Sequence, residues 1–318
     1  MTSIDTREAT PAERAADGSF RRRESRFRDH VTADGSSGYP AEHGRYHLYV
    51  ALACPWAHRT IIYRHLKGLE DAISMTIVDP ERDERGWAIT DTRGTTPDTV
   101  NHFTFLSEAY VVSDTQFDGH VTVPVLWDRE RGRIVNNESS EIIRMLDREF
   151  DAFATHPERR YCPDELRAEI DEINAFVYDN VNDGVYRTGF ARTQAAYERS
   201  FGHLFDALDA LDARLATRRF LLGDEITEAD WRLFPTLVRF DAVYVGHFKC
   251  NLRRIVDYPQ LSGYLRDLYQ QPGIAETVDL DHIKRHYYRT HPHVNPMFIV
   301  PVGPALDFTA PHGRDHLR

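Results

Sequence analysis

The stretch RYHLYVALACPWAHRT, residues 45–60, carries an apolar run, a cysteine and a proline-led helical pattern in direct succession. The apolar residues predict a strand over residues 46–52, and the periodicity of residues 55–66 predicts a helix, in whose first turn Pro55 is tolerated. Cys54 therefore lies at the junction of the strand and the helix. Backbone N–H groups and the positive end of the helix dipole stabilise a thiolate there, so Cys54 is a candidate nucleophile.

A buried cysteine that packs as a small apolar residue is the alternative interpretation of Cys54, and the strand-Cys-Pro-helix context favours the reactive one. The motif reads Cys54-Pro-Trp-Ala57, so the second thiol of a C-x-x-C site is replaced by alanine. A mixed disulfide on Cys54 would therefore need an external thiol for its resolution. Cys162 and Cys250 lie far away in the sequence, and we interpret them as structural.

The segments that follow predict an α/β domain with thioredoxin-like order over residues 45–150. A long polar stretch at about residues 80–120 exceeds the usual length of a connection and indicates an insertion. Residues 1–44, rich in Arg, Asp, Glu, Gly and Ser, are expected to form an N-terminal arm. The remaining predicted elements are strands over residues 73–78, 123–127 and 134–135 and a helix from about Glu138.

Helical periodicity replaces the strand signals in the second half, which predicts an all-α domain over residues 160–290. Thr227 is expected to cap a helix, with Asp230 completing a capping box. Residues 291–318 form a C-terminal extension in this division of the chain. The apolar residues that mark one long helix face are Phe201, Leu204, Phe205, Leu208, Leu211 and Leu215.

Two segments near the predicted strands are candidate ligand contacts. Pro124 interrupts a β-branched run, which fits either a proline on an edge strand or a cis proline whose neighbouring backbone binds a peptide-like ligand. Asn137-Glu-Ser-Ser140 begins a helix, where N–H and hydroxyl groups suit a carboxylate and Glu138 suits an ammonium group. Ordinary helix capping explains the second segment equally well.

Composition narrows the classes of function. A chain of 318 residues, 41% hydrophobic and 28% charged, has enough material for about two folded domains. Its net charge of −11 argues against a dedicated nucleic-acid binder. The N-terminal residues lack the apolar core of a secretory signal, and no apolar run reaches the length of a membrane span. We therefore expect a cytoplasmic protein without membrane association.

Several kinds of site are disfavoured. Neither the Rossmann nor the Walker glycine pattern is present, nor is Gly-x-Ser-x-Gly. The cluster of His286, His291 and His293 has no companion ligands at the spacing of a known metal site, so we expect no metal.

Several motifs together resemble the glutathionyl-hydroquinone reductases, the Xi class of glutathione transferases. The resemblance covers about residues 20–304. The motifs are RYHLYVALACPWAHRT at 45–60, VTVPVLWD at 121–128, NESSEIIR at 137–144, NDGVYRTGF at 182–190, the segment 227–230, DAVYVGHFKCN at 241–251 and HYYRTHPHVNP at 286–296.

The resemblance implies a role for individual residues. It makes Cys54 the nucleophile, Tyr186 the proton donor, and Tyr244 and Tyr287 further aromatic-site residues, with Tyr287 preferred to Tyr288. Glutathione would be held by Trp87, His120, Val121, Thr122, Val123, Glu138 and Ser139, and His120 stands where the family has an arginine.

The implied activity is reduction of a glutathionyl-hydroquinone by a homodimeric enzyme, with glutathione as co-substrate and a Cys54–glutathione mixed disulfide as intermediate. Two alternatives remain. One is an omega-like thiol transferase or dehydroascorbate reductase, and the other is a non-catalytic binding module on the same fold, in which Cys54 is inert.

Overall fold

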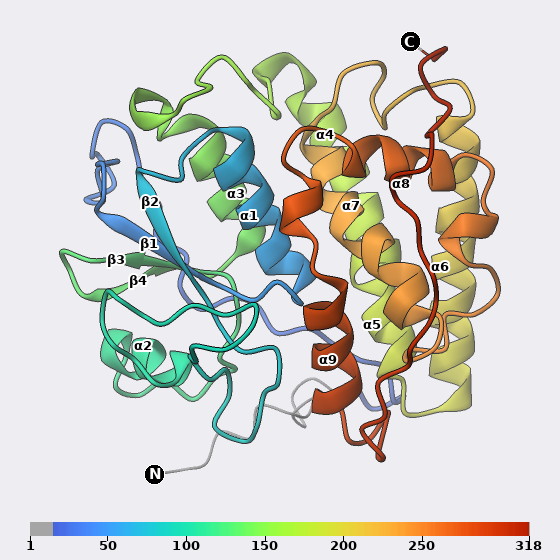
Figure 1. Ribbon diagram of the computed structural model, residues 1–318, viewed down its shortest axis with the longest axis horizontal. Helices are drawn as coiled ribbons and strands as arrows, with labels where there is room; N and C mark the ends of the chain where they lie inside the picture. Colours follow the sequence, from blue (N-terminus) through green and yellow to red (C-terminus); the bar gives the residue numbers. More distant parts are fainter. Residues whose placement is uncertain (1–14, 318) are drawn as a thin grey trace. The chain divides into compact units, whose positions relative to one another are not determined.

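The computed structural model describes residues 15–317 (Figure 1), which form two compact units. We call the first the sheet unit; of the described residues it contains Glu24–Arg160 and Thr277–Thr290. The second, the helical unit, contains residues 15–23, Tyr161–Glu276 and residues 291–317. The first fourteen residues of the predicted N-terminal arm and the last residue of the predicted extension lie outside the described residues.

The sheet unit is built on four strands in the order β2-β1-β3-β4. β1 runs parallel to β2 and antiparallel to β3, and β4 is antiparallel to β3. This order confirms the predicted thioredoxin-like arrangement, with the strand that leads into Cys54 at the centre. The strands are β1 (Tyr46–Val50), β2 (Ile73–Ile77), β3 (Val125–Asp128) and β4 (Arg133–Asn136).

Two helices of the sheet unit pack side by side, α1 (Pro55–Leu66) and α3 (Ser139–Arg148) (Figure 1). Their apolar positions, such as Ile62 and Ile143, are fully buried, as the periodicity of both segments predicts. α1 follows β1 and α3 follows β4, so both helices begin directly after a strand. Their N-termini carry Cys54 and Glu138, the two residues whose positions matter most for the site.

The connection between β2 and β3, where the sequence predicts an insertion, contains a helix that the sequence analysis did not foresee, α2 (Leu106–Ser113). α2 is short, and it packs beside β4. Two of its valines, Val111 and Val112, are exposed, which obscures the amphipathic pattern on which a sequence-based prediction depends.

The Val123–Pro124 peptide bond is cis, and Pro124 directly precedes β3. β3 is bordered by β1 on one side and by β4 on the other, so the interpretation as an edge-strand proline is wrong. Proline is tolerated here because it stands before the first residue of the strand, where its missing N–H removes no ladder bond.

The helical unit confirms the predicted helical character of the second half. Thr227 and Asp230 form the predicted capping box at the start of α7, with the Asp230 carboxylate accepting from the Thr227 N–H at 2.8 Å. No helix among residues 15–317 is both long enough and apolar enough to cross a bilayer. The helices are α4 (Arg167–Val177), α5 (Gly184–Gly189), α6 (Gln194–Leu215), α7 (Glu228–Arg239) and α8 (Leu261–Tyr269), with π-helical segments at Tyr178–Asn182 and Phe240–Tyr244.

The last helix, α9 (Leu280–Thr290), groups with the sheet unit although it follows the helical segments in the chain. His286 of α9 bonds to the carbonyl of Pro80 at 2.7 Å, and Arg285 pairs with Glu81 at 2.9 Å. Helical periodicity identifies such a segment as a helix, but it does not tell which unit the apolar face will pack against.

Candidate active site

Cys54 occupies the N-cap position of α1, as the strand-to-helix junction predicts. Pro55 is the first residue of the helix, and the carbonyl of Cys54 accepts the first helical hydrogen bond from the His58 N–H at 2.9 Å. Cys54 is partly exposed, and its Sγ lies 3.5 Å from the carbonyl oxygen of Val123. The interpretation of Cys54 as a buried apolar residue is therefore wrong, because the residue is not fully buried and it caps a helix N-terminus.

Tyr110, a residue of α2, holds the backbone of residues 121–123 in place through hydrogen bonds to Thr122. The Tyr110 hydroxyl donates to the Thr122 carbonyl at 2.7 Å and accepts from the Thr122 N–H at 3.2 Å. Burial raises the pKa of Tyr110, so this hydroxyl keeps its proton and remains a donor. The Asn137 amide donates to the Tyr110 hydroxyl and to Thr122 Oγ1, both at 3.2 Å. Val121 and Val123 are buried, and Thr122 is exposed.

Glu138 is the N-cap residue of α3, and the capping interpretation of this segment is confirmed. Its Oε1 accepts from the N–H of Ser140 at 3.1 Å and from the Ser140 hydroxyl at 2.8 Å. Its Oε2 accepts from the Ser25 hydroxyl at 3.0 Å. A carboxylate has about four lone-pair sites, so these three bonds leave room for one more donor.

Ser139, the first residue of α3, is buried, and its hydroxyl accepts from Arg59 of α1 at 3.4 Å. The Arg59 guanidinium in turn lies over the ring of Trp56, the residue two positions after Cys54. A hydrogen bond thus links the first turn of α3 to α1, whose N-terminus carries the thiol.

Trp87 lies in the middle of a stack. The Arg82 guanidinium is 4.9 Å from the centroid of the indole, and His286 of α9 stacks on it with a centroid distance of 4.9 Å and an interplanar angle of 16°. The indole is 3% exposed, and its Nε1 has no hydrogen-bond partner among residues 15–317. Buried polar groups usually have a hydrogen-bond partner, so an indole N–H without one is a candidate donor to a ligand.

Three further residues of the sheet unit were candidates. His120 precedes the fixed backbone of residues 121–123 and is half-buried. Tyr287 and Tyr288 both lie on α9 and are both buried, at 1% and 8% exposure. Tyr287 packs edge-on against His286, the residue that stacks on Trp87.

Tyr186 and Tyr244 belong to the helical unit, where their rings lie 6.2 Å apart. Phe248 packs against both, stacked on Tyr244 and edge-on to Tyr186. Gly189 makes this packing possible, because a Cβ there would lie 2.2 Å from the Phe248 ring. Tyr244 ends one π-helical segment and Tyr186 follows the other, and such segments are frequent at functional sites.

Within the sheet unit the structure therefore brings Cys54 next to Val123, and Trp87 next to α9. Sequence reasoning missed Tyr110, which bonds to the backbone of Thr122, and Arg82, which lies over Trp87. It also missed Ser25, which donates to Glu138. Tyr110 lies in a helix without a clear pattern, and Ser25 lies in the arm, so neither carried a recognisable signal. Among the described residues there is no group of three or more His, Cys, Asp or Glu side chains that could hold a metal ion.

Comparison with known proteins identifies the family of the chain. Residues 53–149 match the family model of the glutathione S-transferase N-terminal domain, and residues 194–267 match that of the C-terminal domain. A glutathionyl-hydroquinone reductase of Escherichia coli, YqjG, is 51% identical over 94% of this chain and 93% of its own length. Its glutathione-bound structure superposes with a TM-score of 0.89 over 92% of this chain and 96% of that one.

A Xi-class glutathione transferase from Natrialba magadii is 53% identical, with a TM-score of 0.90 over 92% of this chain and 89% of its own. Two-domain matches of this kind define a glutathione transferase fold. The chain belongs to the glutathione transferase family and, within it, to the Xi class of glutathionyl-hydroquinone reductases.

Proposed function

We propose that the protein reduces glutathionyl-hydroquinones to hydroquinones, with glutathione as co-substrate and Cys54 as the nucleophile. The observation that supports this most directly is the position of Cys54, a partly exposed residue, at the N-terminus of α1. Backbone N–H groups and the helix dipole favour the thiolate there, which is the form that attacks a sulfur atom. The family to which the chain belongs supplies the substrate class.

In the first step the Cys54 thiolate attacks the sulfur that joins glutathione to the aromatic ring. A sulfur–sulfur bond forms as the carbon–sulfur bond breaks, and the aromatic carbon takes a proton from the hydroxyl of Tyr186. The products are a neutral hydroquinone, a Cys54–glutathione mixed disulfide and a Tyr186 phenolate. We assign this proton to Tyr186 by the resemblance of its motif, and we place Tyr244 and Tyr287 at the aromatic ring on the same ground.

In the second step the thiol of a free glutathione attacks the mixed disulfide. Oxidised glutathione leaves, the Cys54 thiolate is restored, and the proton released by the incoming thiol returns to Tyr186. Ala57 replaces the second cysteine of a C-x-x-C motif, so the resolving thiol comes from the co-substrate. A cycle of two half-reactions with a covalent intermediate gives ping-pong kinetics.

Glutathione is held, in this proposal, by groups of the sheet unit that suit its chemistry. Glu138 keeps an acceptor site for the ammonium group of the γ-glutamyl end, and Ser139 with the N-terminus of α3 suits its carboxylate. The backbone of residues 121–123 suits the peptide part, and Trp87 offers its N–H. His120 takes the place of the family's arginine.

Replacement of Cys54 tests the proposal. Cys54→Ala should abolish turnover of a glutathionyl-hydroquinone, whereas Cys162→Ala, at a buried thiol elsewhere in the chain, should retain it. Intact-mass analysis of the wild-type enzyme with substrate and without free glutathione should show one glutathione adduct, and Cys54→Ala should show none. Wild-type turnover by Cys54→Ala would overturn the mechanism.

The resemblance also supports a homodimer and a cytoplasmic location. Light scattering behind size exclusion tests the first, with twice the chain mass of 36.8 kDa expected. Fractionation of the source cells tests the second.

A further inference from the structure

Arg22, from the segment before the sheet unit, lies against the ring of Tyr186. The carbon of its guanidinium is 4.6 Å from the centroid of the tyrosine ring. Both residues belong to the helical unit, although more than 160 positions separate them in the chain. A guanidinium over an aromatic face at this distance is a cation–π contact.

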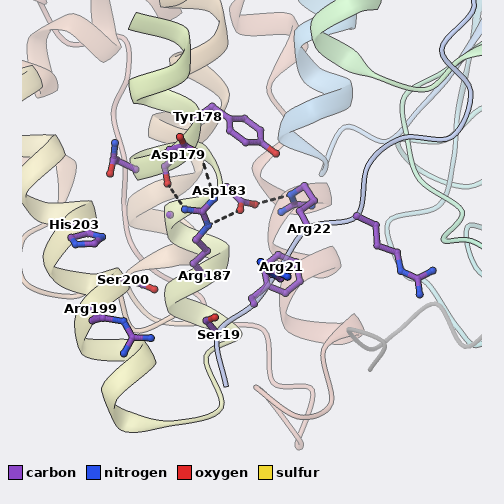
Figure 2. A pocket seen from close by; sticks show the side chains of 14 residues that line it. Ser19, Arg21, Arg22, Tyr178, Asp179, Asp183, Arg187, Arg199, Ser200 and His203 are labelled. Atoms are coloured by element: carbon purple, nitrogen blue, oxygen red, sulfur yellow. Dashed lines mark hydrogen bonds and ion pairs between the residues drawn. The ribbon is translucent and has the colours of Figure 1, made fainter. Parts of the chain in front are cut away.

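A buried carboxylate fixes the orientation of this guanidinium. The Arg22 Nε donates to Asp183 at 2.7 Å, and Arg187 donates to the other oxygen of Asp183 at 2.9 Å. Figure 2 shows Asp183 between the two arginine side chains. The Asp183 side chain is 2% exposed, so its bonds to both arginines are shielded from water.

Arg22 carries its charge at every pH at which the enzyme works. Burial alone would lower the pKa of Arg22, but Asp183 and the phenols of Tyr186 and Tyr178 shift it upward overall. Electrostatic interaction is reciprocal, so the same cation favours a negative charge on the Tyr186 oxygen.

The proposed reaction creates that charge, because Tyr186 becomes a phenolate when it gives its proton to the aromatic carbon. A fixed cation beside the phenol is already in place when the charge develops, which is the arrangement that stabilises a transition state. The rings of Phe190, Tyr244 and Phe248, which also lie against Tyr186, bring no formal charge to it. Arg22 is therefore the cation of the helical unit that this geometry couples to the phenol.

We propose that Arg22 is a positioning residue for Tyr186, which holds the phenol ring in place and stabilises the phenolate formed by proton transfer. The inference rests on the proposed function, in which Tyr186 is the proton donor. It assigns to the segment before the sheet unit a part in proton transfer to the aromatic carbon, a step that exchange of glutathione with a small mixed disulfide does not contain.

The test compares two reactions in the full-length enzyme. Arg22→Gln should lower kcat for a glutathionyl-hydroquinone by roughly tenfold, the size of a partly desolvated cation–π contact, with KM for glutathione unchanged. Exchange of glutathione with a small mixed disulfide should stay at the wild-type rate. Arg22→Lys should recover part of the loss, because lysine restores the positive charge but lacks the planar guanidinium group and its fixed set of N–H donors.

Arg21→Gln and Arg23→Gln are matched controls, since both residues are exposed neighbours in the same segment. Arg22 borders a cavity of about 630 Å³, so a glutamine there has room, and mixed-disulfide exchange reports whether each variant is folded. Both controls should keep wild-type kcat, and a loss equal to that of Arg22→Gln would overturn the proposal.

A double variant decides whether Arg22 acts through Tyr186. In a Tyr186→Phe background, Arg22→Gln should cause no further loss, because the phenol it stabilises is gone. An undiminished tenfold loss in that background, or wild-type kcat for the single variant Arg22→Gln, would overturn the role of Arg22 while leaving the Cys54 cycle intact. Failure of the proposed Cys54 mechanism would be recognised separately, because the Cys54→Ala variant would then still turn over the substrate.

Discussion

The hydroxyl of Tyr110 lies 2.7 Å from the carbonyl oxygen of Thr122, so a helix of the insertion holds the backbone that precedes the cis peptide bond. This backbone is also the one whose Val123 carbonyl meets the Cys54 thiol. The hydroxyl of Tyr110 thus stabilises the backbone segment that we propose as part of the glutathione site.

Tyr110→Phe should therefore weaken glutathione binding and lower stability together. The change removes the hydroxyl partner of the Thr122 carbonyl and N–H, and one of the two partners of the Asn137 amide, which costs about 2 kcal/mol. We expect KM for glutathione to rise several-fold in steady-state kinetics. Tyr46→Phe is the control, because the Tyr46 hydroxyl donates to the Pro40 carbonyl at the same 2.7 Å. It should lose about 1 kcal/mol of stability with KM unchanged, and a similar KM rise there would contradict the assignment.

Trp87→Phe tests whether the indole N–H binds the co-substrate. Neither Trp87 Nε1 nor Trp127 Nε1 has a hydrogen-bond partner in the described part of the chain, and both rings are buried in the sheet unit. Trp127 lies in the inner strand β3 and packs against Tyr49 and Phe103. Loss of one hydrogen bond to glutathione should raise KM roughly tenfold in Trp87→Phe. Trp127→Phe should leave KM as it is, and equal effects in the two variants would rule out the proposed contact.

Buried histidines predict acid sensitivity between about pH 6.5 and pH 4. Burial lowers the pKa of His47 to about 4, of His247 to about 3 and of His282 to about 4. An unfolded histidine titrates near ~6.5, so between these values the unfolded chain binds more protons and stability falls as the pH falls. Above pH 6.5 their contribution is fully present.

His47→Gln should make this fall shallower by about 1.4 kcal/mol per pH unit, measured by urea unfolding at pH 6.0, 5.5 and 5.0. Glutamine keeps polar atoms near Ser74 and Thr76, whose hydroxyls lie 2.7 and 2.9 Å from the imidazole nitrogens. His203→Gln, on the exposed face of α6, should leave the slope at its wild-type value. An unchanged slope in His47→Gln would show that this histidine is not the source.

Local patterns were enough to predict the strand-cysteine-helix junction and the capping box at Thr227. Each of these depends on residues that are neighbours in the chain, where turn and helix chemistry acts directly. The state of Pro124 was left open, because a sequence does not tell whether the next strand will lie at the edge or inside the sheet. The sequence did not predict α2, because the helix has only eight residues and two of them are exposed valines, which obscure its amphipathic pattern.

Two of the residues that support the site could not be found from the sequence either, because their partners lie more than 100 positions away in the chain. Ser25 reaches Glu138 across 113 positions, and Arg22 reaches Asp183 across 161. Such pairs follow from the folded path of the chain, and nothing in the sequence next to Ser25 or Arg22 indicates a partner so far away. The resemblance named Tyr186, but the cation beside it became visible only in three dimensions.

The return of α9 to the sheet unit has a consequence for synthesis. On the ribosome, β1 to α3 emerge early, yet the surface that receives His286 and Arg285 waits until α9 has also left the exit tunnel. A nascent chain halted after residue 276 would therefore leave Trp87 without its stacking partner, so the sheet unit reaches its final form only after the segments Tyr161–Glu276 of the helical unit have been made.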